Sequence, residues 1–219
     1  TGCARDMEEP NNKENLMKKS TFWVAAAAAL IIAAPQVQAE KFLQLSLVPD
    51  VQMVPATDGV SGLRLAIWSD NASMSGLDLG IVNTTSGDFS GVGLGIDNLV
   101  DGSGLGVQWS LYGRTTGDFT GWHAALISRV GGDMLGLQNS WVSLTGGDCS
   151  GWQHGLFYAN VDGHMKGLQT GIVTSAKSAS GVQLGLLNMA GDMYGIQIGL
   201  VNMIETGKFK FFPIVNAKF

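Results

Sequence analysis

The residue types that most often carry out chemistry are scarce in this chain of 219 residues. The histidines are His123, His154 and His164, and they stand at unlike positions of the repeat that fills the chain. No pair of them has the spacing of metal ligands backed by cysteine or carboxylate. No group of serine, histidine and aspartate, and no carboxylate pair, shares one plausible site. We therefore predict no metal, no cofactor and no enzymatic activity.

Two further patterns suggest chemistry at first sight. Cys149 occupies a place where other repeats carry Phe89, Phe119 or Met134, so we expect a small buried hydrophobe rather than a nucleophile. The segment Gly91-Val-Gly-Leu-Gly-Ile has glycines spaced as in a dinucleotide loop, but neither a following helix nor a βαβ unit accompanies it. Neither pattern predicts a reactive site.

Aspartates recur after glycines along the chain. If the chain formed parallel coils, these aspartates could line up as a column of calcium ligands, but the nonapeptide calcium repeat is absent and turn capping is favoured. The Gly-Asp pairs are Gly87-Asp88, Gly117-Asp118, Gly132-Asp133, Gly147-Asp148 and Gly191-Asp192.

Tryptophans are numerous for the length. Such residues anchor proteins at membrane interfaces, pack in cores or stack on sugar rings, and we favour interface or packing roles. Those in the repeats are Trp68, Trp109, Trp122, Trp141 and Trp152.

Composition narrows the class of protein. Charged residues make up only 14% of the chain and the mean hydropathy is +0.18, so part of the surface is expected to face something other than water. The net charge of -5 argues against nucleic acid as a partner, because phosphate binding needs a basic surface.

The first segment resembles a targeting sequence. Met17-Lys18-Lys19 is followed by an apolar stretch from residue 22 to 34 and by Val37-Gln38-Ala39, a pattern typical of a secretory signal peptide. We predict a leader or read-through over residues 1–16, a signal peptide over 17–39 cleaved after Ala39, and a repeat domain over 40–219. Cleavage would leave Cys149 without a partner for an internal disulfide.

The elements that must position these residues come from a repeat of 14 to 16 residues. Each repeat has a glycine followed four residues later by another small residue. Pairs in which both are glycine are Gly76 and Gly80, Gly91 and Gly95, Gly151 and Gly155, Gly167 and Gly171, Gly181 and Gly185, and Gly195 and Gly199. Apolar residues stand one, three and five residues after the first glycine, as in Leu77, Leu79 and Ile81, and this period of two predicts strands. The opposite face carries glycine, glutamine and small residues.

Two all-β architectures satisfy the pattern. The first, which we favour, is an antiparallel β-barrel of about ten short strands whose apolar face meets lipid. The alternative is a parallel β-solenoid in which the apolar face turns inward and like residues stack. Its asparagine ladder would include Asn83, Asn98, Asn188, Asn202 and Asn216.

The end of the chain favours the barrel. Phe211, Val215 and Phe219 belong to an alternating segment that resembles the terminal strand of outer-membrane barrels, where it would serve as a membrane-assembly signal. This resemblance implies outer-membrane lipid and the barrel-assembly machinery as partners.

The repeat itself also resembles that of a known group. Residues 181–188 and 195–202 are similar to bacterial surface proteins with Gly-Leu-Gln-Ile-Gly-Leu-Ile-Asn repeats. The resemblance covers residues 62–219 and is weakest from Trp109 to Ser150; Asn139 and His154 replace apolar residues. It implies a surface or outer-membrane location and no activity. We expect a structural component or narrow passive pore of the outer membrane, or alternatively a secreted solenoid for adhesion or glycan binding.

Overall fold

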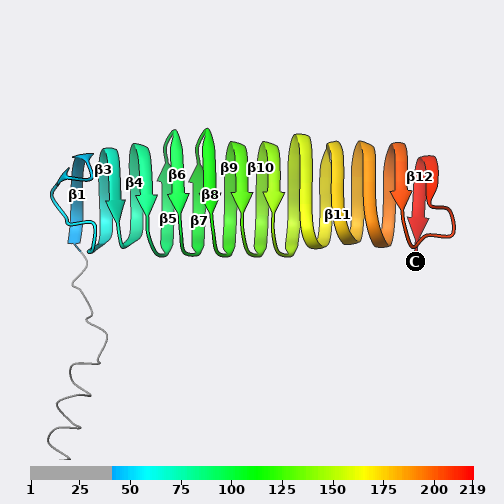
Figure 1. The fold of residues 1–219 in the computed structure, drawn as a ribbon, viewed down its shortest axis with the longest axis horizontal. Helices are drawn as coiled ribbons and strands as arrows, with labels where there is room; N and C mark the ends of the chain where they lie inside the picture. The colour runs from blue at the N-terminus through cyan, green and yellow to red at the C-terminus, as the bar shows by residue number, and fades with distance from the viewer. Residues whose placement is uncertain (1–40) are drawn as a thin grey trace, which may run out of the picture. The chain divides into compact units, whose positions relative to one another are not determined.

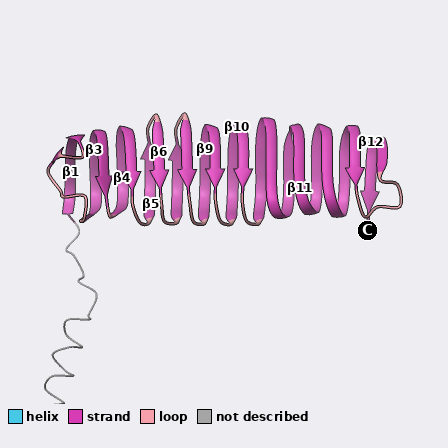
Figure 2. Cartoon of the chain, in the orientation of Figure 1, coloured by secondary structure: helices cyan, strands magenta, loops and turns pink. Residues whose placement is uncertain are grey.

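The computed structural model describes residues 41–219, which form strands joined by short loops (Figure 2). The predicted leader (1–16) and signal peptide (17–39) lie outside the described residues. Within residues 41–219, no helix has the length and apolar character needed to cross a membrane. The strands are β1 (Lys41–Val48), β2 (Val51–Gln52), β3 (Gly59–Asn71), β4 (Ser73–Thr85), β5 (Phe89–Leu94), β6 (Asp97–Val100), β7 (Gly104–Trp109), β8 (Tyr112–Thr115), β9 (Phe119–Val130), β10 (Met134–Thr145), β11 (Cys149–Ile204) and β12 (Phe211–Lys218).

Successive repeats stack in parallel, each beside the next (Figure 1). β9 and β10 pair so that Gly121 lies beside Gly136, and β10 pairs with the start of β11 so that Gly136 lies beside Gly151. One repeat makes one coil, and each coil contributes two strand segments separated by a bend. The long β11 continues through several coils (Figure 1). The fold of the described residues is a parallel β-solenoid.

The expected antiparallel barrel is therefore wrong, and the alternative of a parallel solenoid is confirmed. A barrel would pair neighbouring strands in opposite directions, whereas β3, β4, β5, β7, β9 and β10 pair in parallel and in matching register. The physical reason is that one repeat contains two short strand segments and a bend instead of one strand and a hairpin. The expected passive pore depended on the lumen of a barrel and is therefore no longer supported.

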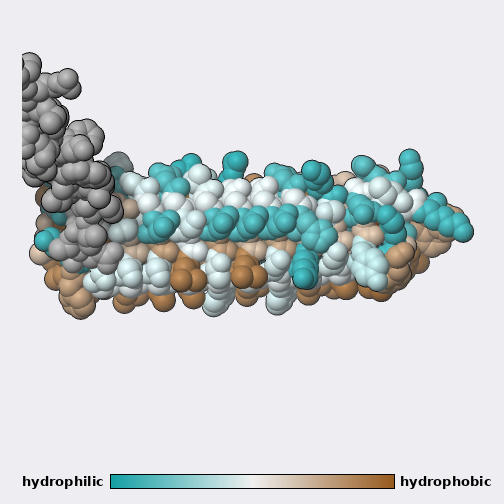
Figure 3. Space-filling model, turned by 90° about the horizontal axis from the view of Figure 1, so that it is seen from below, coloured by the Kyte–Doolittle hydropathy of each residue, from teal (hydrophilic) through white to brown (hydrophobic). Residues whose placement is uncertain are grey.

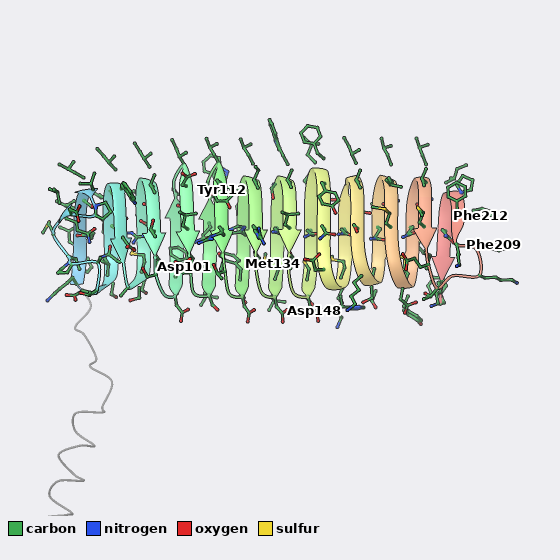
Figure 4. The ribbon with its side chains drawn as sticks, in the orientation of Figure 1. Asp101, Tyr112, Met134, Asp148, Phe209 and Phe212 are labelled. Carbon is green, nitrogen blue, oxygen red and sulfur yellow. The ribbon has the colours of Figure 1, made fainter. Side chains whose placement is uncertain are left out.

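The interior of the solenoid is apolar near the Gly-Asp turns and polar further from them. The residue two positions before the first glycine is buried in most coils, as in Phe89, Phe119 and Met134, and Figure 4 shows Met134 inside its coil. The residue two positions after the first glycine is usually a buried glutamine. The residues predicted to be apolar and alternating point outward, since Leu77 is 40% and Ile81 47% exposed. The expectation that the apolar face of a solenoid turns inward is therefore wrong. The coil is narrow, and the face that carries small residues and glutamines fits inside it.

The buried glutamines form a continuous hydrogen-bonded ladder. Gln153 donates to Gln138 over 2.9 Å and Gln169 donates to Gln153 over 2.8 Å, and the series continues through Gln183 to Gln197 at 2.7 Å per step. Each side-chain nitrogen also donates across the interior to a backbone carbonyl, such as that of Ser175 for Gln169. The ladder thus ties coils together and also links the two sides of each coil.

The predicted asparagine ladder forms only in separate pieces. Asn83 donates to Asn98 over 3.0 Å, and Asn188 donates to Asn202 over 2.8 Å. The coils between these pairs carry Gly113, Ser128, Ser143, Ala159 and Thr174 at the equivalent place, so the asparagine stack is interrupted. Asn216 lies opposite Gln197 on β12, and its side-chain nitrogen donates to the backbone carbonyl of Asn202 over 3.5 Å.

Glycine is required at the first repeat position by backbone conformation and crowding. All ten such glycines have positive φ, and a Cβ on Gly121, with φ of 130°, would overlap the Gly106 carbonyl oxygen. At the second position the constraint is close approach alone: a Cβ on Gly199 would overlap the Gly185 carbonyl oxygen. The repeat glycines named from the sequence all lie in such stacks.

The last coil is covered by a strand that runs the other way. β12 pairs antiparallel with the end of β11, and Lys218 forms an ion pair with Asp192 and a 2.9 Å hydrogen bond with Thr206. Phe211, Val215 and Phe219 belong to or follow this strand and are exposed. Their role as a membrane-assembly signal stays a prediction.

Candidate ligand-binding face

Two of the reactive residue types are locked in the core. His123 is fully buried, hydrogen-bonds Ser128 and lies 4.9 Å from the Phe119 ring. Burial lowers its pKa to about 4, so the ring is neutral near pH 7. Cys149 is buried as predicted, and burial raises the pKa of its thiol to about 12, which keeps it from acting as a thiolate.

The aspartates of the Gly-Asp turns bind backbone along one edge of the solenoid. Asp118 accepts the backbone N–H of Asp133 over 2.8 Å, and Asp133 accepts that of Asp148 over 2.7 Å. Figure 4 shows Asp148 at this edge, pointing outward. Across residues 41–219 no cluster of three or more histidine, cysteine or acidic side chains is placed to hold a metal ion. Turn capping is the role that these contacts show.

The outward strand positions form a surface that we call the apolar face. It consists of the residues one, three and five positions after each first glycine, from Leu63 in the first coil to Leu200 in the last. No Asp, Glu, Lys or Arg stands at any of these positions. Seen along the edge with the Gly-Asp turns, hydrophobic side chains gather on one side of a hydrophilic row (Figure 3). Exposed apolar surface of this extent usually marks an interaction site.

A hollow of about 540 Å³ interrupts the apolar face in the middle coils. Its floor contains Ala124 and Ala125 of β9, where other coils carry larger side chains at the first of these positions, such as Leu94. Trp109 of β7 lines it on one side, and Trp141 of β10 on the other. Small floor residues between protruding indoles create the hollow.

Polar groups gather at the same hollow. Asn139 and His154 line it at a position that is leucine or isoleucine in half of the coils, and Asn139 has no side-chain hydrogen bond within residues 41–219. The Thr170 hydroxyl contacts His154 Nδ1 at 2.8 Å and accepts the Trp152 indole N–H at 3.0 Å. These bonds fix the imidazole and leave its Nε2 for an outside partner.

Ser110 stands beneath this hollow with its hydroxyl turned into the coil. Ser110 lines it, is only 6% exposed, and its Oγ has no hydrogen-bond partner. Buried hydroxyls are normally paired, because leaving one unpaired costs about 1–3 kcal/mol. The Ser110 Oγ lies beside Gly113 on the inward side of the coil and has no accessible surface, so it does not face a ligand in the hollow.

A larger hollow of about 640 Å³ lies at the N-terminal end, between β1, β2 and the first coil. Its lining is mainly aliphatic, and its polar side chains are mostly already engaged: Ser46 donates to Trp68 O over 2.6 Å and Gln52 to Asp70 O over 2.9 Å. We therefore take the central hollow, with its free polar groups, as the candidate site.

The sequence had indicated part of this site. Asn139 and His154 had been noted as replacements of apolar residues, Trp109 and Trp141 as members of a numerous set of tryptophans, and all four line the central hollow. The contribution of Ala124 was missed, because a small residue at an outward position carries no signal until its neighbours are known. Comparison with protein-family models, curated proteins and solved structures finds no match to this chain.

Proposed function

We propose that the protein is an exported, non-catalytic surface protein that binds an external ligand at the central hollow of its apolar face. The observation that carries this proposal is the gathering of Trp109, Trp141, Asn139 and His154 around one depression on a charge-free surface. Sites for small ligands are largely apolar hollows with a few convergent polar groups, and hollows of about 300–1,000 Å³ are usual. Export rests on the predicted signal peptide.

The location is tested on intact cells that express the gene. We expect external protease to remove the protein without lysis, and heated and unheated samples to migrate alike in detergent gels, because a solenoid has no closed barrel to melt. Protection from protease in intact cells would contradict a surface location.

Binding is tested with beads coated with the full purified chain. We expect wild-type beads to attach to mucin-coated wells, and beads carrying the double variant Trp109→Ser and Trp141→Ser to lose attachment. Both side chains are more than half exposed, so the variant should keep the circular dichroism of the wild type. Equal attachment by both proteins would rule out the hollow as the binding site.

Contact with outer-membrane lipid is a second candidate, favoured by the length of the charge-free apolar face. An uncharged face suits the acyl region of a bilayer, and its tryptophans suit the interface. We expect lipid-embedded quenchers in neutral phosphatidylcholine vesicles to reduce the tryptophan fluorescence. Unchanged fluorescence, with the chain remaining at the bottom of a flotation gradient, would exclude lipid contact.

A further inference from the structure

The walls of the central hollow indicate what kind of ligand fits it. Trp109 is 64% and Trp141 51% exposed, so each indole offers a flat apolar surface. The C–H faces of a sugar ring pack against such surfaces, while its hydroxyls need hydrogen-bond partners at the edge. We infer that the hollow binds a neutral sugar ring; this inference rests on the proposed function and names its ligand class.

Hydrogen-bonding groups of the right kinds lie beside the indoles. The Asn139 amide can donate and accept at once, and the His154 Nε2 does one or the other according to its tautomer. A hydroxylated ligand can pair with both groups, whereas a hydrocarbon chain would leave them unpaired.

The charges of this region favour an uncharged ligand. None of the residues that line the hollow is acidic, lysine or arginine. An acidic sugar would therefore meet no cation in the hollow. The geometry points to a neutral mono- or disaccharide unit.

The inference is tested by applying the full labelled chain to a printed array of neutral and acidic glycans. We expect binding to be confined to neutral glycans, and a neutral disaccharide released from a bound glycan to change the tryptophan fluorescence saturably. Trp109→Ala should weaken this binding about tenfold or more, since a central aromatic contact commonly contributes that much. Asn139→Leu, which restores the apolar residue usual at this position, should weaken it as well.

Trp68→Ala is the matched control, because Trp68 is also exposed but lies outside the hollow. It should bind like the wild type. Binding of acidic glycans alone, or equal binding by Trp109→Ala, would overturn the inference. A silent array would overturn it too; if bead attachment still depended on Trp109 and Trp141, the proposed function would stand with a ligand of another class.

Discussion

Arg64 and Asp78 bring an ion pair into the interior where later coils carry glutamine. Asp78 accepts two hydrogen bonds from the guanidinium, at 2.7 and 2.6 Å, and Arg64 also donates to the Thr84 carbonyl over 2.9 Å. Burial raises the pKa of the Asp78 carboxyl, and the guanidinium opposes this shift. The pair links neighbouring coils as the glutamine ladder does. Because its members are charged, removing either one leaves the other unpaired in the interior.

Replacing one member of this pair should be costly. Arg64→Met leaves a buried carboxylate without its cation, and we expect the free energy of unfolding to fall by about 3–5 kcal/mol. Urea denaturation followed by circular dichroism measures this. The double variant Arg64→Met with Asp78→Leu should regain most of the loss, since an apolar pair of similar volume is often neutral. A single variant as stable as the wild type would contradict the interpretation.

His123 occupies the ladder place that Gln108 and Gln138 hold in the adjacent coils. Its pKa is lowered from 6.5 to about 4 by burial, so the unfolded chain binds a proton more readily between these values. The contribution of the neutral ring to the free energy of unfolding is fully present above pH 6.5 and declines as the pH falls to about 4. The lost stability amounts to about 3 kcal/mol.

His123→Gln should remove this acid sensitivity, because glutamine does not titrate. We expect the stability difference between variant and wild type to shift in favour of the variant as the pH is lowered from 7 to 4. Thermal melting at several pH values gives the comparison, with the carboxylates acting equally in both proteins. Parallel pH profiles would show that the ring is not buried as a neutral group.

At the scale of elements, the glutamine ladder joins equivalent positions of successive coils, from β10 through β11. Gln169 lies inside the ladder: it donates to Gln153 and to Ser175 O, and it accepts from Gln183. Gln169→Leu should lower the free energy of unfolding by about 2–4 kcal/mol, because several buried groups lose partners.

Gln197→Leu is the control, since Gln197 ends the ladder and its side-chain oxygen already lacks a partner. We expect a smaller loss there. Denaturant midpoints of the two variants provide the test, and an equal or greater loss at Gln197 would mean that the ladder does not couple the coils.

The sequence predicted the faces of the strands better than their direction. Alternation such as Leu77, Leu79 and Ile81 shows which residues share a face, and the Gly-Asp pairs show where turns lie, but both are compatible with hairpins or with coils. Direction depends on whether Gly80 or Gly95 marks a bend within a coil, and a small residue alone does not say so. The sequence pointed to the site only through Asn139 and His154, which depart from the apolar pattern. The hollow itself is formed by side chains of neighbouring coils, and their contacts are not known before the fold is.

At the scale of the whole solenoid, each coil contacts chiefly its neighbours, so stability should be nearly a sum over coils and their interfaces. The chain is therefore expected to tolerate loss of a complete coil far better than loss of part of one. Residues 181–194 form such a unit, with Gly181 stacked between Gly167 and Gly195.

Deleting residues 181–194 should leave a folded, shorter solenoid, because Gly195 can then stack on Gly167 and Gln197 can donate to Gln169. Deleting only residues 181–187 changes the register by half a coil and would turn apolar face residues inward, so we expect it to abolish folding. Circular dichroism and melting curves separate the two cases. Cooperative unfolding of the first protein and not the second supports coil-by-coil stacking, whereas failure of both would show that the coils after Gly167 depend on contacts beyond their nearest neighbours.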